Sequence, residues 1–152
     1  MSNAQHEYLT EPEFRAWHGA LQFTNEAMRA LDEALRSAHD ISITEFDVLI
    51  TLYNAPERRL RMAELSERVT LTPSGLTHLA TRLERKGFVT RVVDPADRRS
   101  FFAKLTAAGD RRLRESRTTH NKVVRARLTR RLSAKQLRAL GDLWKVIESE
   151  PT

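Results

Sequence analysis

Six polar side chains recur at helical spacing in the middle of the chain. They stand three or four residues apart in turn, so an α-helix places them along one continuous stripe: Ser74, Thr77, His78, Thr81, Arg82 and Arg85. Each of them can donate a hydrogen bond, and none carries a carboxylate. The outer face of an ordinary surface helix usually mixes both signs of charge. This stripe therefore favours hydrogen bonding to a partner rich in acceptor atoms, such as a nucleic acid.

The residues behind and before this stripe have the types needed to hold such a helix in place. An apolar face repeats at helical spacing: Leu76, Leu79, Ala80 and Leu83. Thr72 is a good N-cap, and Pro73 suits the first helical position. The free backbone N–H groups of this first turn, with Ser74, suit phosphate contacts. A helix that reads base edges in a major groove needs both an apolar anchor and a polar face.

A predicted β-hairpin follows this helix. Two short β-branched or aromatic runs, Phe88–Val93 and Ser100–Leu105, flank the polar segment DPADRR. We expect Asp97 to brace one arginine of the tip while the other projects outward. A guanidinium on a narrow hairpin can enter a minor groove and sense its width. The alternative is a solvated turn whose charges neutralise one another: Asp94, Asp97, Arg98 and Arg99.

The remaining elements are predicted to be helices. Capping residues and apolar spacing place them at about 12–40, 42–54, 62–69 and 106–131, with a last one after Ser133. The first helix carries a sustained apolar stripe about 40 Å long. That stripe either belongs to the core or packs on a second subunit. The segment Arg114–Lys122 has no large apolar residue, so it is either a solvated bridge or a helix held by its ends.

Composition limits the classes of function. The 152 residues include 26 Lys and Arg against 20 Asp and Glu, a net charge of +6, and no cysteine. The first 40 residues hold 3 basic and 7 acidic groups, so the positive charge lies in the rest of the chain. This balance indicates an anionic partner, either nucleic acid or a membrane surface. The absence of cysteine excludes disulfides, thiolate metal sites and thiol redox sensing.

Other classes find no support in the sequence. No apolar run is long enough to cross a bilayer, and the polar first residues are not a signal peptide, so we expect a cytoplasmic protein. Phosphate-binding glycine loops and the common hydrolase motifs are missing, so we expect no enzyme and no cofactor. The five histidines show no close i, i+4 pair, so we expect no metal site.

Residues from about Ile43 to Gly109 resemble the MarR (multiple antibiotic resistance regulator) family. The resemblance rests on the stretch LRMAELSERVTLTPSGLTHLATRLERKGFVTRVVDPADRRSFFAKLTAAG, with its D-x-x-D-R-R hairpin and K-L-T-x-x-G exit. It implies a mainly α fold with a small β-hairpin wing, a winged helix-turn-helix. Residues 43–105 would form the DNA-binding domain, and residues 1–42 and 106–152 a helical dimerisation region. A homodimer would then bind a pseudo-palindromic double-stranded DNA site as a transcriptional regulator, expected to be a repressor.

The resemblance also implies roles for individual residues. Ser74, Thr77, His78 and Arg82 would face the major groove, although His78 departs from the family's usual small or basic residue. Arg99 would enter the minor groove, Arg98 would contact phosphate, and Asp94 and Asp97 would orient the wing. The full set expected to contact DNA is Thr72, Pro73, Ser74, Thr77, His78, Arg82, Arg85, Arg98 and Arg99. The set expected in the dimer interface is Phe14, Trp17, Leu21, Leu137, Leu140, Trp144 and Ile147.

The sequence says least about how the activity of the protein is regulated. The family often binds small aromatic or anionic effectors, and four residues are candidates to line such a cleft: Trp17, His18, Phe46 and Tyr53. The alternative is that these aromatic side chains fill the core. Two further alternatives for function stay open, namely a ligand-independent architectural DNA-binding factor and a winged-helix module that binds protein.

Overall fold

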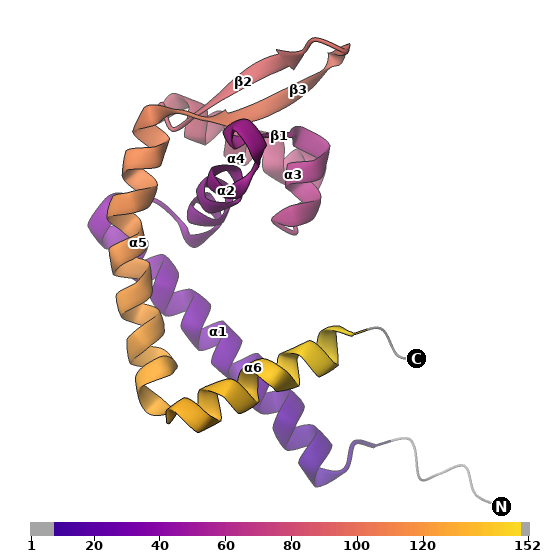
Figure 1. Ribbon diagram of the computed structural model, residues 1–152, viewed down its shortest axis with the longest axis vertical. Coiled ribbons are helices and arrows are strands. Elements are labelled where there is room, and N and C mark those ends of the chain that lie inside the picture. The colour runs from indigo at the N-terminus through magenta and orange to yellow at the C-terminus, as the bar shows by residue number, and fades with distance from the viewer. Residues whose placement is uncertain (1–7, 150–152) are drawn as a thin grey trace, which may run out of the picture.

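The computed structural model describes residues 8–149. In that range the chain forms α1 (Glu11–His39), α2 (Ile43–Asn54), β1 (Arg59–Arg61), α3 (Met62–Arg68), α4 (Pro73–Arg85), β2 (Val89–Asp94), β3 (Asp97–Leu105), α5 (Ala107–Arg127) and α6 (Ala134–Glu148). Figure 1 shows α2, α3, α4 and the sheet gathered at one end, which we call the winged head. From it α1 and α5 extend downward, and α6 turns back across the lower end.

Capping side chains begin the helices where the sequence predicts. The Ser42 hydroxyl accepts the Glu45 N–H at 3.0 Å, and the Glu45 carboxylate accepts the Ser42 N–H at 2.8 Å, which completes a capping box. Ser133 begins α6 with another capping box, and the Thr72 and Thr106 hydroxyls each accept one N–H at the start of α4 and α5. The predicted helices are therefore confirmed, with ends within a few residues of those expected.

The sheet is antiparallel, with strand order β1-β3-β2. The predicted hairpin is present, but β3 begins at Asp97, three residues before the predicted Ser100. Arg98 and Arg99 therefore lie on a strand and not in a six-residue loop. β1 was not predicted, because these three residues become a strand only by pairing with β3, where Leu60 lies opposite Ala103.

The core of the winged head is built mainly from leucine. The apolar face predicted for α4 is fully buried, with Leu76, Leu79, Ala80 and Leu83 at most 2% exposed. The three leucines pack with Phe46 and Leu49 of α2 and Leu65 of α3 in one cluster. Burial on this side fixes which face of α4 is left to solvent.

The middle of α5 is neither a solvated bridge nor held only by its ends. The His120 ring stacks on Phe46 with centroids 4.7 Å apart, and the Arg117 guanidinium lies 5.1 Å from the centre of the Tyr53 ring. The Ser116 hydroxyl is buried and donates to the Arg112 carbonyl at 2.8 Å. Polar and aromatic groups replace the large aliphatic residues that this segment lacks.

The lower part of the molecule exposes large apolar side chains. Leu31 and Leu35 of α1 are buried, but the stripe emerges toward the N-terminus: Phe14 is 55% exposed, Trp17 61% and Leu21 43%. On α6, Leu137 and Leu140 are half-buried and Trp144 and Ile147 are exposed. The long stripe thus serves the core only in its C-terminal half. In residues 8–149 no helix has the length and hydropathy needed to span a membrane.

Candidate nucleic-acid interface

The start of α4 lies at the surface of the winged head. Thr72, Pro73 and Ser74 are all exposed. The Thr72 hydroxyl oxygen accepts the Gly75 N–H at 3.1 Å and lies 3.3 Å from the Ser74 hydroxyl. The positive end of the helix dipole and two hydroxyl groups therefore face outward together, an arrangement suited to a phosphate group.

The predicted stripe of α4 is exposed except for Thr81, which is half-buried. The Thr77 hydroxyl donates to the Pro73 carbonyl and the Thr81 hydroxyl to the Thr77 carbonyl, both at 2.9 Å. Their hydrogens are thus used inside the helix, and the Thr77 oxygen remains free to accept. Each member of the stripe can donate, as expected, but in this conformation these two threonines donate to the backbone of α4.

Arg91 of β2 ties the wing to α4. Its Nε donates to Glu84 at 2.7 Å, and its Nη2 donates to the Thr81 hydroxyl at 2.8 Å. Glu84 also accepts the Arg91 backbone N–H at 3.0 Å. Glu84 lies off the reading stripe, as its position in the sequence predicts, and it fixes the angle between α4 and the hairpin. Sequence reasoning missed Arg91, because only the fold brings β2 beside the last turns of α4.

The two acidic residues of the wing hold its backbone. Asp97 accepts the Arg99 N–H at 3.0 Å and the Ser100 hydroxyl at 2.6 Å. The Ser100 hydroxyl, followed by the Arg99 N–H, lowers the pKa of Asp97 below its ordinary value. Asp97 was expected to brace an arginine side chain, and in this respect the expectation is wrong. Because β3 starts at Asp97, the nearest donors are those of the strand itself.

The arginine side chain that pairs with the wing comes from β1. Arg61 Nη2 lies 2.7 Å from a carboxylate oxygen of Asp94, a residue only 2% exposed. The other Asp94 oxygen accepts the Ala96 N–H at 2.9 Å, which shapes the tip. Sequence reasoning missed Arg61, although three arginines in four residues, at 58, 59 and 61, are a signal that could have drawn attention to this segment.

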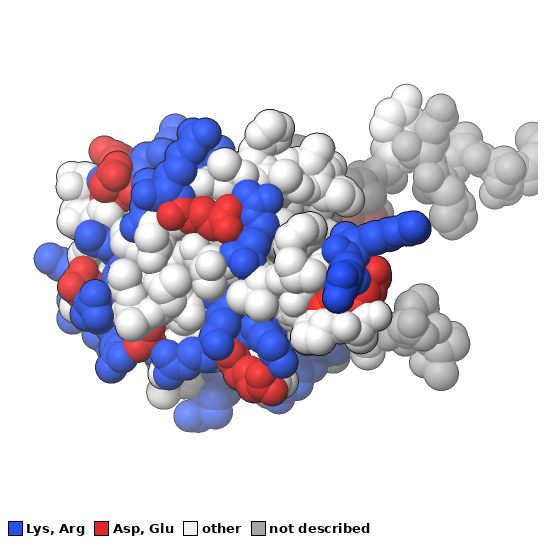
Figure 2. All heavy atoms as spheres, turned by 90° about the horizontal axis from the view of Figure 1, so that it is seen from above, with Lys and Arg blue, Asp and Glu red and all other residues white. Residues whose placement is uncertain are grey.

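Ion pairs distinguish the cations that stabilise the fold from those that remain free to bind an anion. Figure 2, seen from the wing end, shows Lys and Arg spread over the surface with acidic side chains between them. Many of these cations are paired, as Arg91 and Arg61 are. The guanidinium groups of Arg85, Arg98 and Arg99 are exposed and form no ion pair with any residue in 8–149. Within residues 8–149, these three and the exposed Lys104 of β3 are the cations of α4 and the wing that form no ion pair, so they remain free for an external anion.

Comparison with known proteins identifies the family. The sequence model of the MarR family matches residues 41–101. The structure is similar to that of Sco3205, a MarR family transcriptional regulator from Streptomyces coelicolor in complex with DNA. The similarity has a TM-score of 0.86 and 32% identity, and it covers 95% of this chain and 91% of that one. The chain belongs to the MarR family.

Two relatives from Bacillus subtilis support the assignment. The HTH-type transcriptional regulator YkoM is 38% identical over 72 residues, which are 47% of this chain and 46% of YkoM. The HTH-type transcriptional repressor YetL is 27% identical over 124 residues, 80% of this chain and 74% of YetL. The chain thus spans about half the length of the first curated relatives that it matches.

The four aromatic residues expected to line an effector cleft do not meet within one chain of this MarR family protein. Trp17 and His18 lie in the N-terminal half of α1, about 33 Å along the helix from its end at His39. Phe46 is 2% exposed and belongs to the core, as the alternative interpretation predicts. Tyr53 lies with Arg58 and Arg117 at 4.7 and 5.1 Å from its ring centre. Within one chain, therefore, these four side chains do not line a common cleft.

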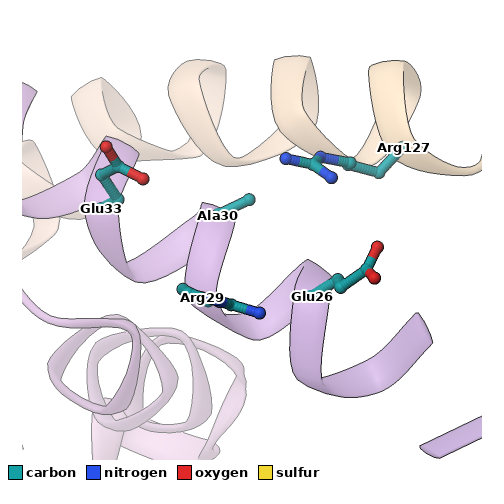
Figure 3. Close-up of a pocket in the computed structure, with 5 residues that line it drawn as sticks. All are labelled: Glu26, Arg29, Ala30, Glu33 and Arg127. Atoms are coloured by element: carbon teal, nitrogen blue, oxygen red, sulfur yellow. The ribbon is translucent and has the colours of Figure 1, made fainter. Parts of the chain in front are cut away.

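A hollow of different character lies between α1 and α5 (Figure 3). Its lining residues are Glu26, Arg29, Ala30, Glu33 and Arg127. Arg127 reaches from α5 toward α1, and the carboxylates of Glu26 and Glu33 flank it (Figure 3). Both signs of charge are present and no aromatic ring lines the hollow, so it does not have the chemistry that selects an aromatic anion.

Proposed function

We propose that this chain is a sequence-specific DNA-binding transcriptional regulator, a repressor that acts as a homodimer on a pseudo-palindromic operator. One observation carries the proposal. The acid-free face of α4 and the unpaired arginines of the wing are exposed on the same winged head and are joined rigidly through Arg91 and Glu84. The DNA complex of Sco3205 and the name of the repressor YetL support it. A binding protein of this kind needs no catalytic group.

We infer a DNA contact for each of these residues. With α4 in the major groove, Ser74, Thr77, His78 and Arg82 reach base edges, and Arg85 reaches the flanking backbone. Thr72 and the helix start receive a phosphate. The wing then lies over the adjacent minor groove, where Arg99 enters and Arg98 contacts phosphate. Contacts to phosphates position the head, and contacts to bases specify the sequence.

The homodimer is proposed from the exposed apolar surface of the lower helices. Phe14, Trp17 and Leu21 of α1 and Trp144 and Ile147 of α6 are exposed in a single chain. Large apolar side chains left exposed together mark an interaction site. We assign residues 1–42 and 106–152 to dimerisation and residues 43–105 to DNA binding. A twofold dimer would then hold two α4 helices about 34 Å apart, one turn of DNA.

An effector, if it acts, must bind one spacing of the two heads better than another. We propose a small aromatic or anionic molecule bound between the dimerisation helices and the winged head, where Tyr53 is half-buried and available. A ligand that spreads the heads would release the operator. The regulator would act in the cytoplasm, where the DNA is.

The test is selection of bound duplexes from a random pool. We expect enrichment of an inverted repeat whose half-sites lie about one helical turn apart. Arg99→Ala should then weaken binding to the selected duplex at least tenfold, about 1.4 kcal/mol or more. Arg130→Ala removes another exposed arginine, in the turn after α5 and outside the residues expected to contact DNA or the second chain, and should leave the affinity unchanged.

Three results would contradict the proposal. Recovery of no duplex would favour a protein-interaction module, and binding without any enriched sequence would favour an architectural factor. A flat dependence of affinity on salt concentration would exclude phosphate contacts, because counterion release makes DNA binding strongly salt-dependent.

A further inference from the structure

A buried carboxylate lies against α4, the helix that we place in the major groove. Glu45, which is 3% exposed, belongs to the first turn of α2 and faces the last turns of α4. Its Oε2 accepts the Ser42 N–H at 2.8 Å and lies 3.2 Å from Lys86 Nζ. Its Oε1 lies 3.8 Å from Arg82 Nε. One carboxylate thus joins the start of α2 to two cations at the end of the helix that we place in the major groove.

The two cations are held to different degrees. Lys86 is mostly covered, with 28% of its side chain exposed, and it also donates to the backbone carbonyl of Asp40 at the end of α1. Arg82 is 57% exposed and stands farther from Glu45. Burial makes an unpaired carboxylate costly, so Lys86 serves as its fixed partner. Arg82 keeps freedom to move while its charge is partly balanced.

The contact also sets which donors Arg82 presents. Nε is the nitrogen through which Arg82 pairs with Glu45, which leaves Nη1 and Nη2 to donate to another partner. Two parallel donors of this kind match the O6 and N7 acceptors of guanine in the major groove. The partly balanced charge, at the same time, weakens the attraction of Arg82 for phosphates of any sequence.

We propose that Glu45 is the positioning and specificity-determining residue of Arg82. It orients the guanidinium for a guanine edge and suppresses contacts that do not depend on sequence. It does not itself touch DNA. The inference rests on the proposed function, because it assumes that the α4 stripe reads base pairs. A buried residue of α2 thus contributes to recognition by orienting a residue of α4.

The test is Glu45→Gln. Glutamine keeps the shape and can still accept the Ser42 N–H, but it removes the charge that faces Arg82. We expect affinity for random-sequence duplex to rise, and the ratio of operator to random affinity to fall at least about fivefold. The loss should concentrate at one guanine of each half-site. Glu67→Gln is the matched control: Glu67 is exposed on α3, forms no ion pair within residues 8–149, and its loss changes the net charge equally. It should leave the ratio unchanged.

A double-variant cycle separates positioning from a general effect on the fold. In the Arg82→Ala background, Glu45→Gln should leave the ratio unchanged, because the side chain through which it acts is gone. If Glu45→Gln fails to fold, Lys86→Gln tests the same contact. Without Lys86 the carboxylate holds Arg82 more tightly, so operator affinity should fall, again only when Arg82 is present.

The possible failures are distinguishable. If the wild-type protein selects no duplex, both this inference and the proposed function are wrong. If it selects an operator and Glu45→Gln leaves the ratio unchanged, the inference alone is wrong. An equal fall of the ratio in the Arg82→Ala background would likewise overturn it, because Glu45 would then act by another route.

Discussion

The start of α5 depends on a glycine that no other residue can replace without strain. Gly109 is buried in the first turn of α5 and faces Phe88, the residue that precedes β2. A Cβ placed on it would lie 2.1 Å from the Phe88 carbonyl oxygen and 2.8 Å from Leu105 Cδ1. The oxygen belongs to the backbone and accepts the Thr106 N–H at 3.1 Å, so it has little freedom to withdraw.

We therefore predict that Gly109→Ala destabilises the protein, opposite in sign to the usual effect of alanine in a helix. Alanine ordinarily gains about 1 kcal/mol over glycine in a helix interior. Overpacking costs about 1–3 kcal/mol. Displacing the Gly109 N–H from the Thr106 hydroxyl, now 3.0 Å away, weakens a cap worth about 1–2 kcal/mol. The net expectation is a loss of about 1–4 kcal/mol, or about 2–16 °C in Tm.

The measurement is thermal or urea unfolding at one fixed protein concentration, because self-association also shifts Tm. Gly19→Ala is the matched control, since Gly19 lies inside α1 and no atom lies within 4 Å of the place that an added methyl group would take. It should raise the stability by about 1 kcal/mol. If Gly109→Ala proves as stable as the wild type while Gly19→Ala stabilises, the close approach at Phe88 is refuted.

Three other predictions concern acid stability, association and the wing. Burial raises the pKa of Asp110, but its hydrogen bond and ion pairs with Arg114 and Arg58 outweigh burial and hold the pKa below its ordinary value. The ionised carboxylate therefore stabilises the fold fully above the pKa of an unfolded Asp, about 3.9, and this stabilisation disappears as the pH falls through the lower pKa of the folded state. Asp110→Asn should lower the stability at pH 7 and lower it progressively less in acid. Trp144→Glu should give a monomer by sedimentation at micromolar concentrations, where we expect the wild type to be a dimer. Asp94→Asn should lower duplex affinity in a fluorescence titration by the same factor as loss of its partner Arg61, and combining the two changes should add little.

The helices follow from local signals in the sequence. Capping side chains such as Ser42, Thr72 and Thr106 act on N–H groups within three residues, so their effect is written in the adjacent sequence. The reading stripe of α4 follows as well, because its apolar opposite face determines which side is buried. The site residues on α4 and the wing remain predictions until DNA binding is measured.

The features that sequence reasoning missed all depend on distant partners. β1 exists through pairing with β3, and Arg61 reaches Asp94 only because that pairing places it there. Glu45 fits a capping box, and nothing near it in sequence indicates Arg82, 37 positions away. The middle of α5 lacks aliphatic residues, so its packing through His120 and Arg117 has no periodic signal.

The attachment of α5 also bears on how the two heads of a dimer would change their spacing. This helix contacts the winged head at both its start and its middle. The Thr106 hydroxyl donates to the Gly87 carbonyl at 2.6 Å, and the His120 ring stacks on Phe46. The nearest place for bending is then the turn at residues 129–131, before α6. The 21 residues of α5 are about 32 Å long. A tilt of α5 by about 6° at this turn therefore displaces the other end of the helix by about 3.4 Å, the rise of one base pair. A rotation too small to disturb the core would thus be enough to shift a head out of register with its half-site.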